Sequence, residues 1–282
     1  MLNEVRKTSI LVWIGISAFL LLSSCSVERK MAKQFVARAQ QYPCLVLYPS
    51  EVLVTNLKHD QRSESFYFID AVKDTSLFRN SMILRTLNDD SLIQPFQDAF
   101  RSEMGQYGLK VYSGDEMEQF TLIREPSLLV NVAQLEIQEY YTDYEDKISV
   151  GEDIYSKVIY LTSINLGAWF EVAKMDSVHE VKYPVLFASH DLTDRWNGYF
   201  TQKLLTGEIQ YKLEIDTISI GEGSSFARYL GRLYAAYTFD YLMNDYIQKS
   251  IPPASQTQKY YRYDPYKKWI FTTEKDRFIL LD

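Results

Sequence analysis

The chain has 282 residues, 46% of them hydrophobic and 15% aromatic, and its 30 Lys and Arg against 37 Asp and Glu give a formal net charge of -7. This length and apolar content suffice for a sizeable hydrophobic core, which excludes intrinsic disorder over most of the chain. The acidic balance argues against a nucleic-acid-binding protein, because such proteins bind phosphates through basic surfaces. Two cysteines are too few for a disulfide framework.

The N-terminal segment has the layout of a secretory signal peptide. Arg6 and Lys7 precede an apolar run over residues 10–22, which is followed by Ser23, Ser24 and Cys25. The run is shorter than the ~20 residues that a helix needs to cross ~30 Å of hydrocarbon. The order of basic, apolar and small residues therefore predicts a signal peptide over residues 1–24.

The motif Leu22-Ser23-Ser24-Cys25 resembles the lipobox of bacterial lipoproteins. The resemblance implies cleavage before Cys25 and covalent attachment of lipid to that residue, with no other cofactor. Each buried CH₂ of an acyl chain contributes about 0.8 kcal/mol, so two or three chains give a stable membrane anchor. The alternative is an uncleaved membrane anchor with Cys25 as an ordinary thiol. Both interpretations place the remaining chain outside the cytoplasm.

The residues after Cys25 indicate the membrane to which the lipoprotein is sorted. In the sorting system of such lipoproteins, Asp at the next position retains the protein in the inner membrane, and this chain has Ser26. The outer membrane is therefore expected, on its periplasmic face rather than the cell surface, because 26–30 is not an acidic tract. Loss of Glu4, Arg6 and Lys7 takes the charge from -7 to -8. An acidic body adsorbs poorly to anionic headgroups, so the expected tether is the lipid rather than a basic surface.

Cys44 is the one thiol that would remain after lipidation of Cys25. It lies in an apolar stretch of strand character, and with no second thiol it cannot form an intramolecular disulfide or a cysteine-based metal site. We expect a buried, inert side chain rather than a reactive one.

The first predicted elements are a helix and three strands. Residues 28–42 have amphipathic helical spacing and end before Pro43, so no long tether separates the lipidation site from the fold. Stretches rich in β-branched and aromatic residues predict strands over 45–48, 52–57 and 66–72.

The clearest helix start is Ser91, which has Gln94 at capping-box spacing and Pro95 in the expected first turn. An apolar stripe follows, formed by Phe96, Phe100, Met104 and Tyr107. Gly108 stands where a left-handed cap ends a helix, and a strand is expected over 109–112.

Two long segments of alternating polarity, 128–141 and 157–173, predict antiparallel strands without a helix between them. Five acidic residues surround Gly151 between these segments: Asp143, Glu145, Asp146, Glu152 and Asp153. We expect a solvated loop here, with a calcium site as the alternative, although the spacing is not that of an EF-hand. Further strands are expected over 182–189 and 208–218, a long helix over 225–247, and terminal strands over 269–272 and 278–281.

The order of elements predicts an α+β fold, an antiparallel sheet meander with helices packed on one face. Residues 25–282 are expected to form a single envelope domain with a Tyr-rich tail from about residue 254. The element order resembles that of auxiliary periplasmic lipoproteins in transport and outer-membrane assembly systems. That resemblance is architectural, and it implies an accessory role in a protein complex.

Motifs for catalysis or nucleotide binding are absent from the sequence. His59, His179 and His190 lie far apart and have no second metal ligand at suitable spacing. His190 and Asp191, with Asp194, could pair as a base and its orienting acid only if adjacent strand residues shared a face, which they do not. Residues 221–225 superficially resemble a phosphate loop but carry Glu222 and no Lys, so a flexible turn and helix cap is expected.

Aromatic residues supply the candidate partner surface. The tail carries Tyr260, Tyr261, Tyr263, Tyr266 and Trp269. Tyr and Trp anchor interfaces through large rigid surfaces with a polar tip, although they also cap strand ends in half-buried sheets. The leading hypothesis is a non-enzymatic, lipid-anchored envelope protein that contacts a protein partner. The alternative is a carbohydrate-binding lipoprotein or a hydrolase using two carboxylates.

Overall fold

The computed structural model describes residues 27–40, 42–58, 67–68, 81, 83–123, 126–174, 184–257, 259–273 and 277–281. The leader, Cys25, His59 and His179 lie outside these residues, as does most of the strand expected over 66–72.

Eight strands form the main sheet, in the order β12-β7-β6-β5-β1-β4, with β2 paired to β5 and β3 to β2. Their bounds are β1 (Pro43–Leu47), β2 (Leu53–Asn56), β3 (Tyr67–Phe68), β4 (Lys110–Tyr112), β5 (Leu128–Val150), β6 (Asp153–Lys174), β7 (Val185–Thr193) and β12 (Ile279–Leu281). The α+β class is confirmed, and β5, β6 and β7 are antiparallel as expected. A wholly antiparallel meander is wrong, because β1 runs parallel to β4 and β5, and β2 runs parallel to β5. Each parallel pair is joined by a longer connection that returns the chain to the same sheet in the same direction.

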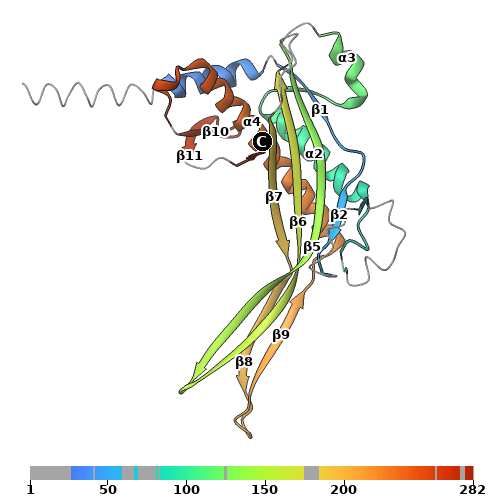
Figure 1. Ribbon diagram of the computed structural model, residues 1–282, viewed down its shortest axis with the longest axis vertical. Helices are drawn as coiled ribbons and strands as arrows, with labels where there is room; N and C mark the ends of the chain where they lie inside the picture. Colours follow the sequence, from blue (N-terminus) through green and yellow to red (C-terminus); the bar gives the residue numbers. More distant parts are fainter. Residues whose placement is uncertain are drawn as a thin grey trace, which may run out of the picture.

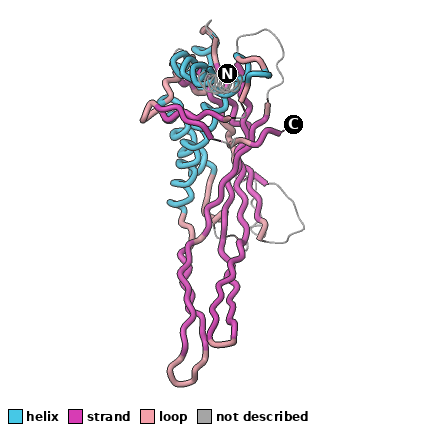
Figure 2. The backbone as a smooth tube through the Cα atoms, turned by 90° about the vertical axis from the view of Figure 1, so that its left-hand side faces the viewer, coloured by secondary structure: helices cyan, strands magenta, loops and turns pink. Residues whose placement is uncertain are grey.

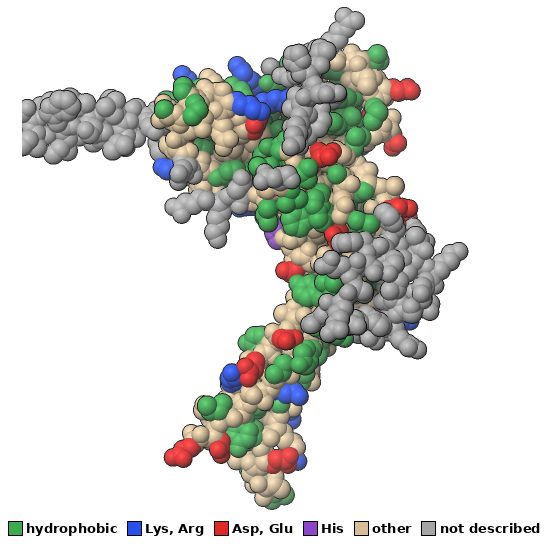
Figure 3. All heavy atoms as spheres, in the orientation of Figure 1, with side chains coloured by type: hydrophobic (Ala, Val, Ile, Leu, Met, Phe, Trp, Pro, Cys, Tyr) green, Lys and Arg blue, Asp and Glu red, His purple; other side chains and the backbone are tan. Residues whose placement is uncertain are grey.

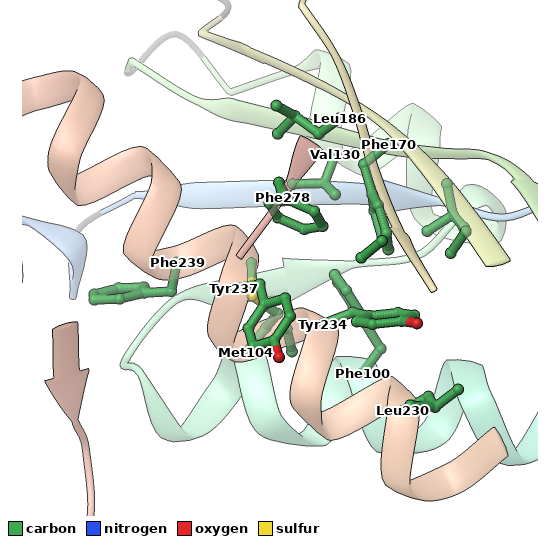
Figure 4. Close-up of a cluster of buried hydrophobic side chains, with 14 of the residues drawn as sticks. Phe100, Met104, Val130, Phe170, Leu186, Leu230, Tyr234, Tyr237, Phe239 and Phe278 are labelled. Carbon is green, nitrogen blue, oxygen red and sulfur yellow. The ribbon is translucent and has the colours of Figure 1, made fainter. Parts of the chain in front are cut away.

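The main helices cover one face of this sheet (Figure 1; Figure 2). They are α2 (Asp89–Gln106) and α4 (Ile220–Ser250), while α3 (Met117–Thr121) is a short turn of helix near β1. A further helix over residues 27–39 packs against α4, where Phe35 contacts Phe239. Figure 4 shows side chains from α2, α4 and the sheet meeting in one cluster. Phe100 of the predicted stripe stacks on Phe170 of β6 with ring centroids 6.0 Å apart. A Cβ at Gly231 of α4 would lie 2.3 Å from the Phe96 carbonyl oxygen, so glycine permits this close crossing of α2 and α4.

Helix α2 begins earlier than expected. Its N-cap is Asn88, whose side chain accepts a hydrogen bond from the Ser91 amide at 2.8 Å, while Ser91 Oγ accepts one from the Asn88 amide at 3.2 Å. The cap predicted at Ser91 is therefore wrong, and Pro95 lies inside the helix. The predicted C-terminal end is confirmed, since Gly108 has a left-handed φ of 91°.

Helix α4 also begins earlier than the sequence suggested. Ser219 is its N-cap and forms a capping box with Glu222, so residues 221–225 are helical and the flexible turn expected there is wrong. The Glu222 carboxylate accepts hydrogen bonds from the Ser219 amide at 2.9 Å and from its hydroxyl at 2.8 Å. The same carboxylate lies 2.8 Å from Arg195. Glu222 in this Gly-rich segment therefore both caps the helix and forms an ion pair.

The acidic segment around Gly151 is not a loop. Pairing of β5 with β6 runs without a break in the hairpin from Tyr140 opposite Ser163 to Val150 opposite Asp153, and the turn is confined to 151–152. Asp143, Glu145 and Asp146 are strand residues, so the predicted solvated loop is wrong. The 23 residues of β5 span roughly 75 Å, and the outer half of the hairpin projects beyond the helices (Figure 1).

A second hairpin projects beside the first in both views (Figure 1; Figure 2). It consists of β8 (Arg195–Gln202) and β9 (Ile209–Asp216), which pair only with each other among the described residues. We call residues 140–162 the β5–β6 arm and residues 195–216 the β8–β9 arm.

Two buried carboxylates fasten the arms to the core. Asp194 accepts hydrogen bonds from the Thr162 amide and the Ile218 amide, both at 2.9 Å, and so ties both ends of the β8–β9 arm to β6. Glu139 accepts hydrogen bonds from Lys58 Nζ at 2.7 Å and Ser81 Oγ at 2.6 Å. Fully buried Lys58 and Glu139 side chains form an ion pair where β5 leaves the core.

The tail forms a small hairpin beside helix 27–39 and α4 (Figure 1). Its strands are β10 (Tyr260–Asp264) and β11 (Trp269–Thr273), preceded by a short 3₁₀ turn, η3 (Pro253–Ser255). Strand β12 then pairs with the edge strand β7. The predicted terminal strands are confirmed.

Candidate functional site

The structure separates the five aromatic residues predicted as one partner surface. Tyr261 is buried, donates its hydroxyl to Glu28 at 2.9 Å, and its carbonyl accepts a hydrogen bond from the Asn244 side chain at 2.7 Å. Tyr263 packs against Tyr107 and Phe239, and Tyr260 is half-buried. Tyr261 and Tyr263 therefore hold the tail to the core. Only Tyr266 and Trp269 present large exposed surfaces.

Trp269 lines a groove of about 460 Å³ between helix 27–39 and the tail hairpin. We call it the basic groove, and its lining residues are Arg29, Lys33, Val36, Ala37, Tyr263, Lys267, Lys268, Trp269 and Ile270. Four of these side chains are cationic and none is acidic. The groove was not predicted from the sequence because its two halves lie more than 220 positions apart in the chain.

The arms carry 12 of the 24 exposed large hydrophobic side chains among the described residues. On β6, Ile154, Val158 and Tyr160 are exposed, and their even spacing places all three on one face of the hairpin. On the β8–β9 arm, alternate positions form an apolar face made of Trp196, Phe200, Tyr211, Leu213 and Ile215. The opposite face carries exposed Tyr199 among the polar residues Arg195, Asn197, Lys212, Glu214 and Asp216.

The two arms touch at side chains rather than by strand pairing. The rings of Tyr144 and Trp196 lie 4.8 Å apart, and the Tyr211 hydroxyl donates to Asp146 at 2.9 Å. At the tip of the β8–β9 arm, Leu204 and Leu205 are fully exposed. This pair was not predicted from the sequence, although two adjacent Leu residues shortly before Gly207 are an unusual signal that indicates it.

The uncovered face of the sheet contains a second hollow of about 640 Å³. Its aromatic end is formed by Trp169 and Phe187, whose ring centroids are 4.5 Å apart over Gly167. Its polar end is organised by Asp191, which accepts hydrogen bonds from the Tyr140 hydroxyl and the Asn165 amide, both at 2.7 Å. This arrangement offers a stacking surface beside fixed polar groups.

His190 and Asp191 point to opposite faces of β7, as their adjacency predicts. His190 Nδ1 lies 3.1 Å from the Tyr234 hydroxyl on the helix-covered face, whereas Asp191 is exposed on the other. Burial lowers the pKa of His190, and Arg277 acts in the same direction while Asp191 opposes it. Asp194 bonds to backbone amides instead of to His190. His190, Asp191 and Asp194 therefore do not form one catalytic group, and each has a structural role at a different place.

Two further predictions concern metals and thiols. Within the described residues, no cluster of His, Cys, Asp and Glu has the arrangement of a metal site, and the acidic residues near Gly151 are spread along two strands. Cys44 is buried in β1, and burial raises the pKa of its thiol to about 12, as expected for an inert side chain.

The chain matches no protein-family model and no curated protein. Within the described part of the chain, none of the helices combines the length and apolar character needed to span a bilayer.

Proposed function

We propose that the protein is a non-enzymatic lipoprotein of the cell envelope, anchored through Cys25 at the periplasmic face of the outer membrane, which assembles with other copies of itself through its two arms. The observation that carries this proposal is the pair of projecting hairpins with exposed apolar faces and strand edges not covered by described residues. Such a role suits an accessory component of a transport or assembly complex.

The energetics of the arms favour association. An isolated two-stranded hairpin is at best marginally stable in water, and open strand edges readily accept another strand. Covering apolar surface contributes about 25 cal/mol per Å², so a neighbour would stabilise the faces that include Ile154, Tyr160 and Leu213. The arms are long and narrow, so only a partner with strands of similar length covers them fully.

A second copy meets this requirement because its arms have the same length. Within one chain, the β8–β9 arm rests on one face of the β5–β6 arm through the Tyr144–Trp196 ring contact. The other face of the β5–β6 arm, with Ile154, Val158 and Tyr160, is left for a neighbouring copy. A repeated head-to-tail contact of this kind builds rings or filaments instead of a closed dimer.

Self-association can be tested with the native lipidated protein in mild detergent, by chemical cross-linking and single-particle mass measurement. The test variant is Ile154→Ser combined with Tyr160→Ser, residues that are 73% and 61% exposed on the β5–β6 arm. The control is Leu122→Ser combined with Tyr229→Ser, which are 81% and 56% exposed away from the arms. We expect multimers for the native protein and the control, and mainly monomers for the arm variant. Monomeric native protein would refute self-assembly.

A carbohydrate-binding role is the second candidate, and the hollow on the uncovered sheet face favours it. Aromatic rings stack on sugar faces, and the Asp191 network beside Trp169 and Phe187 would accept and donate hydrogen bonds to sugar hydroxyls. Titration calorimetry with N-acetylglucosamine oligomers tests it. Binding that is lost in Trp169→Ala and retained in Trp196→Ala would support this role, and no heat of binding would exclude these sugars.

A further inference from the structure

We propose that the basic groove binds the phosphate groups of anionic phospholipids, so that the end of the molecule next to Cys25 rests on the membrane surface. This inference rests on the proposed lipid anchor, and it adds a second, non-covalent contact with the same bilayer. The occupant is the lipid surface rather than a soluble anion.

The charge of the groove supports this occupant. Arg29 and Lys33 are one helical turn apart on helix 27–39, and Lys267 and Lys268 face them from the turn between β10 and β11. Arg29 donates a hydrogen bond to the Ile270 carbonyl at 3.1 Å, which fixes the guanidinium at the groove wall. Lys and Arg side chains gather on this end of the molecule (Figure 3). Anionic headgroups are attracted to such a cluster even when the protein as a whole is acidic.

The turn that presents the lysines is held in one conformation. Asp264 Oδ1 accepts hydrogen bonds from the backbone amides of Tyr266 and Lys267, both at 3.0 Å. Lys268 has a φ of 52°, in the left-handed region that side chains other than glycine seldom adopt. A backbone held in this way presents Lys267, Lys268 and Trp269 together.

The aromatic residue of the groove matches the headgroup region of a bilayer. Trp269 is 60% exposed, and Trp is enriched at the membrane–water interface because its ring is amphipathic. Trp269 lines the groove itself, so a lipid phosphate among the cations would place its glycerol region near the indole ring.

The position of the groove in the chain also fits a membrane contact. Helix 27–39 begins two residues after Cys25, a stretch that extends at most about 7 Å. Arg29 and Lys33 therefore follow the lipidation site by four and eight residues. Acyl chains on Cys25 would bring the groove to the bilayer surface, whereas the tips of the arms lie at the opposite end of the molecule (Figure 1).

The experiment uses the proposed mature chain, residues 25–282, with Cys25→Ser so that no acyl chain contributes. Sedimentation with vesicles of phosphatidylcholine, with or without phosphatidylglycerol, measures binding. We expect binding only to the vesicles that contain phosphatidylglycerol, and weaker binding at high salt. The groove variant Lys33→Glu with Lys267→Glu should bind at least about tenfold more weakly.

A matched control, Lys157→Glu with Lys212→Glu, makes an equal change in net charge but on the arms. It should bind the vesicles as the parent does. Equal binding to both vesicle types, or undiminished binding by the groove variant, would overturn the proposal. Loss of binding in the arm control instead would assign lipid contact to the arms. Circular dichroism and thermal melting verify that each variant is folded.

Failure of the lipid anchor itself would be visible separately, as an unmodified Cys25 in the intact mass of the native protein.

Discussion

The inner and outer halves of the β5–β6 hairpin belong to the same two strands and yet have opposite surroundings. In the inner half, Leu135, Ile137, Leu166 and Phe170 are buried beneath α2 and α4. In the outer half, Tyr144, Ile154 and Tyr160 are exposed, although the strand pairing continues unchanged. Strand pairing along this hairpin therefore continues well beyond the main core, with Ile159 and Leu161 as the buried hydrophobic side chains of the outer half. In the proposed assembly the exposed apolar residues of the outer half would contact another copy, whereas the inner half uses its apolar residues to stabilise the fold.

The largest expected difference in stability between a core substitution and an arm substitution lies on β6. Phe170→Ala removes a ring packed against Phe100, Tyr234 and Phe278, and should lower the free energy of unfolding by about 3–5 kcal/mol. Tyr160→Ala, ten residues nearer the arm tip, should change it by about 0.5 kcal/mol or less. Denaturant unfolding measures both. Similar losses would show that the arm is part of the cooperative core.

The next largest difference in stability is expected between substitutions of two carboxylates on β5. Glu139→Gln leaves the buried Lys58 ammonium without its counter-charge, and should destabilise the protein by about 3 kcal/mol. Glu145→Gln breaks an exposed pair with Lys147 and should cost about 0–1 kcal/mol. Both substitutions preserve side-chain size, so their difference in urea midpoint reports burial of charge. A small effect at Glu139 would mean that Lys58 reaches water where the arms begin.

A smaller, pH-dependent effect is expected at Asp240 of α4. Burial raises the pKa of this carboxyl from its ordinary 3.8 to about 8, against the opposing influence of the Tyr263 amide and Arg277. The folded state then holds a proton that the unfolded state releases, so the contribution of Asp240 to stability is fully present below pH 4 and is lost as the pH rises towards 8. Arg262 lies 3.5 Å from the carboxyl and limits the size of this change.

Unfolding measured from pH 4 to pH 8 should show this slope in the native protein and a flatter profile in Asp240→Asn. Asp153→Asn, an exposed carboxyl at the arm tip, should leave the profile unchanged. An Asp240→Asn profile as steep as the native one would assign the dependence to another group.

Local patterns in the sequence predicted the elements whose residues interact with near neighbours. The stripe of Phe96, Phe100 and Met104 and the left-handed Gly108 are properties of one helix, and both were predicted correctly. The parallel pairing of β1 was not predictable from its own five residues, because it depends on which distant strand lies beside it. The outer half of the β5–β6 hairpin was mistaken for a loop since acidic residues occupy strand positions that face water on both sides.

The aromatic residues of the predicted partner surface lie in different surroundings for a related reason. Five tail aromatics looked equivalent in the sequence, but burial against α4 and Glu28 turns Tyr261 into a core residue and leaves Trp269 exposed. The four cations of the basic groove come from opposite ends of the chain, and the overall negative charge concealed them. A net charge describes the whole surface and does not locate a patch.

Asp194 provides one of two supports of the β8–β9 arm. One carboxylate holds both strands at their base, and the Tyr211 hydroxyl bonds to Asp146 nearer the outer end of the same 8-residue strands. Leu204 and Leu205 lie in the turn beyond both supports, fully exposed. Among the described contacts, the leucine pair is therefore the part of the arm with the least restraint from the rest of the molecule.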